Sequence, residues 1–411
     1  MANFGRTAQK ETLLAALQEE LPQLPIHTYC DPEIYQKEQE LIFQNSARYI
    51  GHEMMVPNVG DWYALPHDDY SRILVRNENG VELLSNVCRH RQALMLGDFS
   101  PGAPDSIIRR GNLRATGGRI MCPLHAWTYD NTGLIVGAPK FPERPCRNLP
   151  RYPLHNVGGF LFEGPRDPVN DIAKLFNQPE MDFSGYAMDH VEMHPCKCNW
   201  KTFLEIYNDD YHIATFHPGL RKYVRSEGLK WEYDDWFSLQ RINVTKNLER
   251  SGTDAYKAWH DGLIAEYGDG APEFGAIWAS YYPTHMIEVF PQALVLSTVY
   301  PKGVHESINV VEFYYPQHLL ENNRELVESH RAAYMETAVE DDEIAERTDA
   351  GRRALYQRGV DDSGPYQIPL EEGMRHFHGW YRGVMGRAIH SRSVRASPTT
   401  PLCNSANTPN L

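Results

Sequence analysis

Two short pairs of cysteine and histidine constrain this chain more than any other sequence feature. Cys88 and His90 are separated by one residue, and Cys122 and His125 by two. Two thiolates and two imidazoles can hold one zinc ion, or a [2Fe–2S] cluster with two cysteines on one iron and two histidines on the other. A cysteine and a histidine one residue apart reach two irons more easily than they chelate one zinc ion. The spacing therefore favours the cluster, with zinc and unrelated loop residues as the alternatives.

The residues around these pairs predict a small all-β domain over 48–165. Short strand-like runs such as SRILVRN, VELLSNV and GGFLFEG alternate there with clusters of Gly, Pro and Asn. Residues 91–121, between the two pairs, contain many Gly and Pro residues, and we expect them to form a surface insertion. Trp127 and Tyr129 follow the second pair and are candidates to shield a cluster from water.

The chain is predicted to contain four segments. These are a helical segment over 1–47, the all-β domain over 48–165 with its insertion 91–121, a larger domain over 166–390 and a tail of loop composition over 391–411. In the first segment, Asp31 is suited to cap a helix and Pro32 to occupy its first position.

The larger domain is predicted to combine an antiparallel sheet with flanking helices, which makes the fold α+β. Strand-like runs dominate about 276–315. Helices are expected around 199–216 and over about 318–357, where Gly351 is a candidate break.

A second group of metal-binding residue types lies in the segment NWKTFLEIYNDDYHIATFHPG, residues 199–219. His212 and His217 are five residues apart, so a regular helix does not align them and a local distortion is needed for both imidazoles to converge. From spacing alone, the two histidines are as well explained as surface or core residues.

Together, the two motifs resemble those of the Rieske non-haem iron oxygenases, in the α (terminal oxygenase) subunit of the aromatic-ring-hydroxylating family. The stretch CRH…CPLHAWTYDNTG resembles the Rieske signature, and NWK followed by E, D-x-Y-H and H-P resembles the mononuclear-iron motif. The resemblance implies that Cys88, His90, Cys122 and His125 bind a [2Fe–2S] cluster. The 31 residues between the pairs exceed the usual family spacing.

The resemblance also implies the residues of a mononuclear Fe(II) site. His212 and His217 match its histidine ligands, and Asp209 matches the acid that connects the iron to the cluster of a neighbouring subunit. Asp341 is the best match for the carboxylate that completes a two-histidine, one-carboxylate triad. Asp342 and Glu340 are the fallback candidates.

Glu205 matches the glutamate of the same motif, although the asparagine that often follows it is Ile206 here. The late histidines His376 and His378 are close to metal-like spacing, but we interpret them as structural because the triad is already complete.

The implied activity is that of a terminal oxygenase that uses O₂ and electrons from a separate reductase or ferredoxin. The chain shows no G-x-G-x-x-G motif opening a βαβ unit, so we expect the electron source to be another protein. The family implies a head-to-tail ring, and we expect a homotrimer. A non-catalytic Rieske electron carrier and a zinc-binding protein are the alternatives from other classes.

The expected reaction is hydroxylation, by mono- or dioxygenation, of a small organic, aromatic substrate, for example ring hydroxylation of an aromatic acid. Monooxygenation of an amine or methoxy compound, ending in demethylation or C–N cleavage, is the alternative. Trp278, Tyr281, Tyr282 and Phe290 are candidates to line the pocket, where they would stack on a ring or contact an ammonium group.

Composition argues against two classes of partner. The formal net charge of −14 disfavours binding to nucleic acid or to an anionic membrane. No apolar run approaches the roughly 20 residues that cross a bilayer, and the N-terminus lacks the pattern of a secretory signal, so we expect a cytoplasmic protein. Within this acidic chain, the insertion carries five arginines: Arg91, Arg109, Arg110, Arg114 and Arg119. They are explained either as a solubilising loop or, in our hypothesis, as part of a docking surface for an acidic electron donor.

Overall fold

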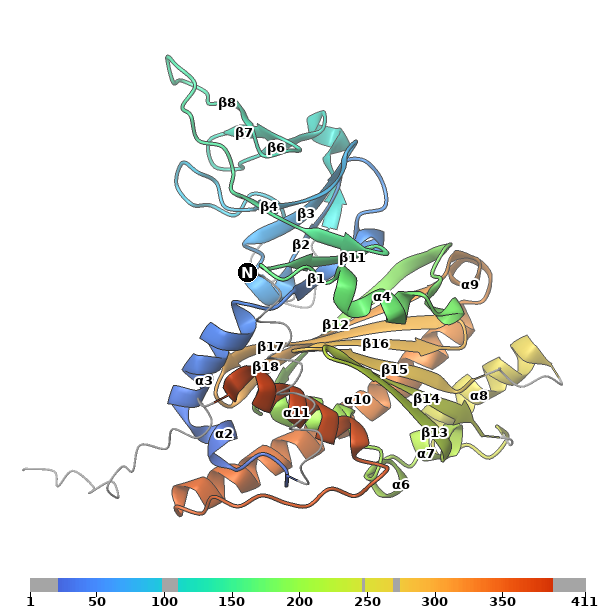
Figure 1. The fold of residues 1–411 in the computed structure, drawn as a ribbon. Helices are drawn as coiled ribbons and strands as arrows, with labels where there is room; N and C mark the ends of the chain where they lie inside the picture. Colours follow the sequence, from blue (N-terminus) through green and yellow to red (C-terminus); the bar gives the residue numbers. More distant parts are fainter. Residues whose placement is uncertain (1–20, 98–109, 246–247, 269–273, 387–411) are drawn as a thin grey trace, which may run out of the picture.

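The computed structural model describes residues 21–97, 110–245, 248–268 and 274–386, and it shows a β-rich N-terminal domain above a larger α+β domain (Figure 1). The predicted tail over 391–411 lies outside this range. Helix α2 (His27–Cys30) leads to helix α3 (Pro32–Glu38), which continues as a π-helical turn over Gln39–Phe43. The Asp31 side chain accepts a hydrogen bond from the backbone N–H of Glu33 and Pro32 opens α3, as the sequence predicts.

The N-terminal domain consists of short antiparallel strands in three sheets. The first sheet has the order β1 (Arg48–His52), β11 (Phe160–Glu163), β10 (His155–Val157). The second has the order β5 (Arg110–Asn112), β2 (Asp61–Ala64), β3 (Arg72–Asn77), β4 (Gly80–Ser85), β9 (Arg151–Tyr152). The third has the order β6 (Arg119–Met121), β7 (Thr128–Asp130), β8 (Ile135–Gly137).

The insertion is more regular than a surface excursion. Its described part contributes β5 to the second sheet and β6 to the third. The backbone of residues 110–121 is therefore built into the domain.

The larger domain is organised around one antiparallel seven-stranded sheet. Its order is β12 (Tyr186–Cys196), β18 (Glu306–Pro316), β17 (Ala293–Gly303), β16 (His285–Phe290), β15 (Ala276–Tyr281), β14 (Phe237–Val244), β13 (Val224–Asp234). The predicted strands over about 276–315 are β15 to β18, and the α+β fold is confirmed.

The helices of the larger domain pack around this sheet (Figure 1). They are α4 (Val169–Phe176), α5 (Trp200–Tyr207), α6 (Ile213–Phe216), α7 (Leu220–Tyr223), α8 (Asp254–Tyr267), α9 (Gln317–Asn322), α10 (Arg324–Gln357) and α11 (Glu372–Met385).

Both faces of the sheet are covered, and its side chains alternate between them. Leu294 and Leu296 of β17 pack in a core shared with the N-terminal domain. Val295, between them, packs in a second core together with Trp259 of α8 and Val327 of α10. The face that carries Val295 is therefore the face on which helices and sheet enclose the candidate site.

Two helix predictions need correction. Helix α10 is continuous through Gly351, where we expected a break. A single glycine costs a helix about 1 kcal/mol, and the packing of α10 on α5 and α8 outweighs this cost. The single helix expected around 199–216 is interrupted, because α5 ends at Tyr207 and α6 begins at Ile213.

Candidate metal centres

Two loops at the tip of the N-terminal domain share one backbone arrangement. The N–H of Cys88 donates to the carbonyl of Ala93, five residues on, and the N–H of Cys122 donates to that of Trp127, also five residues on. Gln92 and Ala126, each four residues after its cysteine, have positive φ angles of 55° and 57°. The two loops therefore present their cysteines and histidines in a similar way.

The side chains of these loops meet each other. The rings of His90 and His125 have centroids 4.8 Å apart, and His90 stacks on Trp127 at 4.9 Å. Cys88 and Cys122 are buried, at 1% and 3% exposure. The sulfur of Cys88 lies 3.7 Å from the hydroxyl of Tyr129.

This arrangement fits a cluster held by two thiolates and two imidazoles. Nδ1 of His90 is buried and has no hydrogen-bond partner among the described residues, which suits a nitrogen that binds a metal. Burial raises the pKa of the Cys122 thiol, and the neighbouring Cys88 raises it further. A metal centre that binds both thiolates removes this cost.

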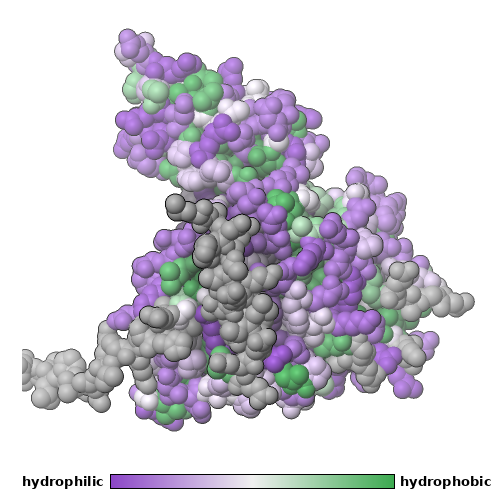
Figure 2. All heavy atoms as spheres, in the orientation of Figure 1, coloured by the Kyte–Doolittle hydropathy of each residue, from purple (hydrophilic) through white to green (hydrophobic). Residues whose placement is uncertain are grey.

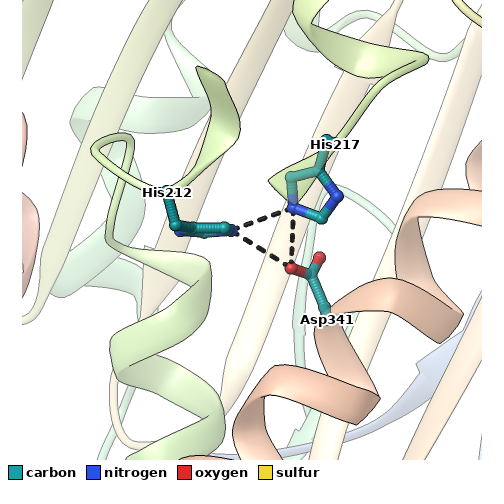
Figure 3. A group of neighbouring side chains, drawn as sticks. All are labelled: His212, His217 and Asp341. Atoms are coloured by element: carbon teal, nitrogen blue, oxygen red, sulfur yellow. Dashed lines mark hydrogen bonds and ion pairs between the residues drawn. The ribbon is translucent and has the colours of Figure 1, made fainter. Parts of the chain in front are cut away.

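A second group of ligands lies between helices of the larger domain. The interruption after α5 turns the chain so that His212 precedes α6 and His217 follows it. Their Nε2 atoms lie 2.9 Å apart. Oδ1 of Asp341, from α10, lies 3.3 Å from Nε2 of His212 and 3.1 Å from Nε2 of His217 (Figure 3). Two donor atoms from one short segment and a third from the distant helix α10 thus face one point.

The charges of this group favour a bound cation. Burial alone would lower the pKa of His212, but Asp209 and Asp341 outweigh it and raise this pKa to about 10. Burial alone would raise the pKa of Asp341, but His212 and His217 lower it. Among the described residues, this is the one group of three or more His, Cys, Asp or Glu side chains whose donor atoms lie within 4.8 Å of one another. Two histidines and one carboxylate suit Fe(II) with open positions for O₂.

Acidic residues also face the outer nitrogens of both histidines. Oδ2 of Asp209 lies 3.1 Å from Nδ1 of His212, and Oε2 of Glu340 lies 2.7 Å from Nδ1 of His217. The Glu340 contact is a hydrogen bond of the kind that fixes the orientation of a ligand imidazole, whereas Asp209 contacts His212 as an ion pair without hydrogen-bond geometry. Asp342, the other fallback candidate, turns away and contacts Nδ1 of His194 at 2.8 Å.

Glu205 lies in a buried network of its own. Its carboxylate is 2.7 Å from Arg352 and 2.7 Å from Nε2 of His378, and it accepts a hydrogen bond from Tyr29. His376 contacts the hydroxyl of Tyr282 at 2.9 Å. Sequence reasoning missed Arg352 and Tyr29, because nothing in the local motif links these distant residues to Glu205.

A pocket opens beside the triad and contains several aromatic and acidic side chains. The aromatic lining residues are Phe203, Tyr207, Tyr256, Trp259, Trp278, Phe290 and Tyr334. The acidic ones are Asp209, Asp210, Glu288 and Asp341. No lysine or arginine is among the described lining residues, and burial lowers the pKa of the lining residue His330 to about 3. The other two lining histidines, His212 and His217, each face carboxylates that balance their charge. The pocket therefore favours a cationic or neutral ligand over an anionic one.

Two of the four predicted lining residues lie elsewhere. Trp278 and Phe290 line the pocket. Tyr281 points to the opposite face of the sheet, where its hydroxyl donates to Asp171. Tyr282 packs in a separate core beneath α11.

Comparison with known proteins decides the family. A family model described as the Rieske [2Fe-2S] domain matches residues 44–153, and one described as the ring hydroxylating alpha subunit (catalytic domain) matches residues 181–387. The chain belongs to the Rieske oxygenase α subunits. It is therefore an oxidoreductase whose cofactors are a [2Fe–2S] cluster and a mononuclear iron, and members of this family take electrons from a partner reductase or ferredoxin.

Two curated relatives are similar over most of this oxygenase. A putrescine 2-hydroxylase of Bordetella bronchiseptica is 56% identical over 364 residues, which cover 89% of this chain and 85% of the relative. A putrescine 2-hydroxylase of Ralstonia nicotianae is 51% identical over 363 residues, which cover 88% of this chain and 95% of the relative.

Among solved structures, the quaternary ammonium Rieske monooxygenase CntA in complex with an inhibitor has the same fold. It matches with a TM-score of 0.68 at 16% identity and covers 88% of this chain and 95% of that chain. In the described part of the present chain, no helix is long and apolar enough to span a membrane.

Proposed function

We propose that this Rieske oxygenase hydroxylates a small aliphatic amine, with a diamine such as putrescine as the leading candidate. The observation that carries the proposal is the pocket, which holds four carboxylates and no lysine or arginine among its described lining residues. The names of the two similar curated proteins support the same substrate class. An aromatic acid, one of the two substrate types considered from the sequence, finds no lysine or arginine among the described lining residues.

The proposed reaction is a monooxygenation. One atom of O₂ enters a C–H bond as a hydroxyl group, and the other leaves as water with two electrons and two protons. When bound, the cluster supplies single electrons and the mononuclear Fe(II) binds and activates O₂. Cys88, His90, Cys122 and His125 would hold the cluster.

The remaining assigned residues would hold and connect the iron site. His212, His217 and Asp341 would bind the iron. Asp209 and Glu340 would hold the two imidazoles in position through their outer nitrogens. The aromatic walls would exclude water from the substrate.

We further propose a head-to-tail homotrimer in which Asp209 connects the iron to the cluster of the neighbouring subunit. The exposed apolar side chains near the cluster loops support a contact there, since Met121, Leu124 and Phe141 are 42%, 53% and 45% exposed. Figure 2 shows apolar surface at the tip of the N-terminal domain. Coexpression of Cys88→Ser and Asp341→Ala chains tests this proposal. Activity restored in mixed rings supports it, and inactive mixed rings contradict it.

The arginines of the insertion support a separate proposal about the electron donor. Arg91, Arg110, Arg114 and Arg119 are exposed, whereas Arg109 lies outside the described residues. Replacing Arg110 and Arg114 by Ala should slow donor-dependent reduction of the cluster and weaken its dependence on salt. Unchanged rates would contradict the docking role.

The substrate class is tested with the anaerobically purified oxygenase. After chemical reduction of the metal centres, the protein is exposed to ¹⁸O₂ with putrescine, choline or benzoate, and products are identified by mass spectrometry. We expect a hydroxylated diamine that carries one ¹⁸O atom and no product from benzoate. Hydroxylation of benzoate without reaction of the diamine would overturn the proposal.

A further inference from the structure

One buried acid in the pocket has no role in the iron triad. Glu288 lies on β16, is 4% exposed and lines the pocket. Its register partners are Trp278 on β15 and Val295 on β17. Directly paired residues of an antiparallel sheet share one face, so Glu288 points with Val295 toward the helices that enclose the site.

Within the described part of the chain, the charge of Glu288 has no basic partner in the pocket. Its Oε1 accepts a hydrogen bond of 2.6 Å from the hydroxyl of Tyr334 on α10. Burial raises the pKa of Glu288 to about 8, the Tyr334 hydrogen bond lowers it in part, and nearby Asp341 raises it further. A buried carboxylate is costly unless a cation or several donors satisfy it. A cationic ligand would supply the positive charge that Glu288 does not find among the described pocket residues.

Aromatic rings surround this carboxylate. Trp278 is its cross-strand partner, and Phe290 follows two residues later on the same face of β16. The rings of Trp278 and Phe290 lie 6.4 Å apart, and those of Phe290 and Tyr334 lie 6.1 Å apart. Aromatic faces attract cations of any substitution, whereas a carboxylate also accepts N–H hydrogen bonds. Together they favour an ammonium group that still carries hydrogens.

The other pocket carboxylates are already engaged. Asp341 faces the two triad histidines, and Asp209 faces His212. Asp210 accepts a hydrogen bond from the amide of Gln240. Glu288 also accepts one side-chain hydrogen bond, but it lies beside the rings of Trp278, Phe290 and Tyr334, whereas Asp210 lies two residues before His212. Glu288 is therefore the acid better placed to bind substrate.

We propose that Glu288 is a specificity-determining residue, which binds the ammonium group of the substrate and selects primary amines over quaternary ammonium compounds. This inference rests on the proposed function, because it assumes an amine substrate. Glu288 would act by positioning the substrate, whereas the triad residues would hold the iron.

The test compares Glu288→Gln with a matched control, Glu312→Gln. Glu312, on β18, is also buried and also accepts tyrosine hydrogen bonds, from Tyr49 and Tyr314. Its register partner is Leu296, so it points to the face opposite Glu288. The control neutralises a similar acid in the same sheet without touching the pocket.

Putrescine binding is measured by calorimetry on the anaerobic, metal-loaded oxygenase, and KM and kcat are measured with the electron donor. For Glu288→Gln we expect Kd and KM for putrescine to rise at least about tenfold, since a hydrogen bond to a charged group is lost. The iron content, the visible spectrum and the Kd of a trimethylated analogue should stay within about twofold. Glu288→Asp, which keeps the charge, should lose less affinity than Glu288→Gln.

The outcomes separate the two proposals. If the unaltered oxygenase neither binds nor hydroxylates putrescine, the proposed function fails. If it does both, while Glu288→Gln and Glu288→Asp bind putrescine as tightly as Glu312→Gln does, the role of Glu288 is overturned. If Glu288→Gln loses its iron, Glu288→Asp decides: a higher Kd for putrescine at normal iron content, with the Kd of the trimethylated analogue unchanged, supports the role, and an unchanged Kd for putrescine contradicts it.

Discussion

The buried carboxylate of Glu205 allows a quantitative prediction about stability. It is 3% exposed and contacts Arg352 and His378, each at 2.7 Å. Arg352 is itself largely buried, since its side chain is 15% exposed. Replacing Glu205 by Gln keeps the shape of the side chain but removes the charge that balances Arg352.

Two routes give the size of the effect. Burial alone would raise the pKa of Glu205, but Arg352 and His378 lower it from 4.5 to about 2. One pKa unit corresponds to about 1.4 kcal/mol, so this lowering corresponds to about 3 kcal/mol. Breaking a buried ion pair by removing one partner costs about 3–5 kcal/mol. We therefore expect Glu205→Gln to lower the free energy of unfolding by about 3 kcal/mol.

The pH dependence of this effect has a defined sign. Because the folded-state pKa of Glu205 is lowered, its stabilisation is fully present above pH 4.5 and is lost as pH falls toward 2. The difference between Glu205→Gln and the unaltered chain should therefore be constant between pH 5 and 8, to within about 0.5 kcal/mol.

The assay is urea unfolding of the full chain, followed by tryptophan fluorescence, for Glu205→Gln, Arg352→Met and the double variant. Removing both charges should recover part of the loss, so the double variant should be more stable than the sum of the single effects predicts. Glu192→Gln is the control, because Glu192 pairs with His190 at the surface with 40% of its side chain exposed. A loss below about 1 kcal/mol for Glu205→Gln, or purely additive effects, would refute the reasoning.

Three further predictions concern the metal centres and one buried acid. Asp341→Ala should reduce the iron content from about three to about two per chain, while the sulfide and the visible spectrum of the cluster remain. Cys88→Ser should remove the cluster with its colour and sulfide, because two cysteines are needed to hold one of its irons. Burial raises the pKa of Glu312 to about 8, so the folded chain retains a proton that the unfolded chain releases above pH 4.5. Glu312→Gln should therefore gain stability over the unaltered chain at pH 8, by up to about 4 kcal/mol, and little at pH 5.

Each of these predictions can fail in a clear way. Full iron content in Asp341→Ala, measured by metal analysis, would exclude Asp341 as an iron ligand, and Asp342→Ala serves as its matched control. A cluster spectrum retained in Cys88→Ser would exclude Cys88, with the exposed Cys146 as the control position. Equal stability of Glu312→Gln and the unaltered chain at both pH values, from urea unfolding, would contradict the raised pKa of Glu312 in the folded chain.

Local motifs determined much of this protein in advance. Cys88 and His90 share one loop, and His212 and His217 flank one short helix. Short spacings of this kind keep the residues of each pair close together, and the resemblance of both motifs to those of the Rieske oxygenases indicated the two metal centres. The alternation of strand-like runs and the amphipathic helices likewise predicted an α+β fold with an antiparallel sheet.

Other features depend on contacts between distant segments, and these only the tertiary structure decided. Asp341 meets His212 across 129 positions of the sequence, and Arg352 meets Glu205 across 147. The interruption between α5 and α6 arises where the chain must turn both histidines toward α10. Gly351 did not break α10, because packing outweighs the preference of one residue.

The two faces of the central sheet show most clearly why the tertiary structure was needed to assign the acidic residues. Glu288 and Glu312 are both acids in strand-like runs, and the sequence gives no reason to assign them different roles. The register places Glu288 beside Val295 and Glu312 beside Leu296, on opposite faces. A shift of one residue would exchange the two faces. The sequence alone indicated which residues are candidates to bind metal, whereas strand register and helix packing decided which carboxylates surround the substrate pocket.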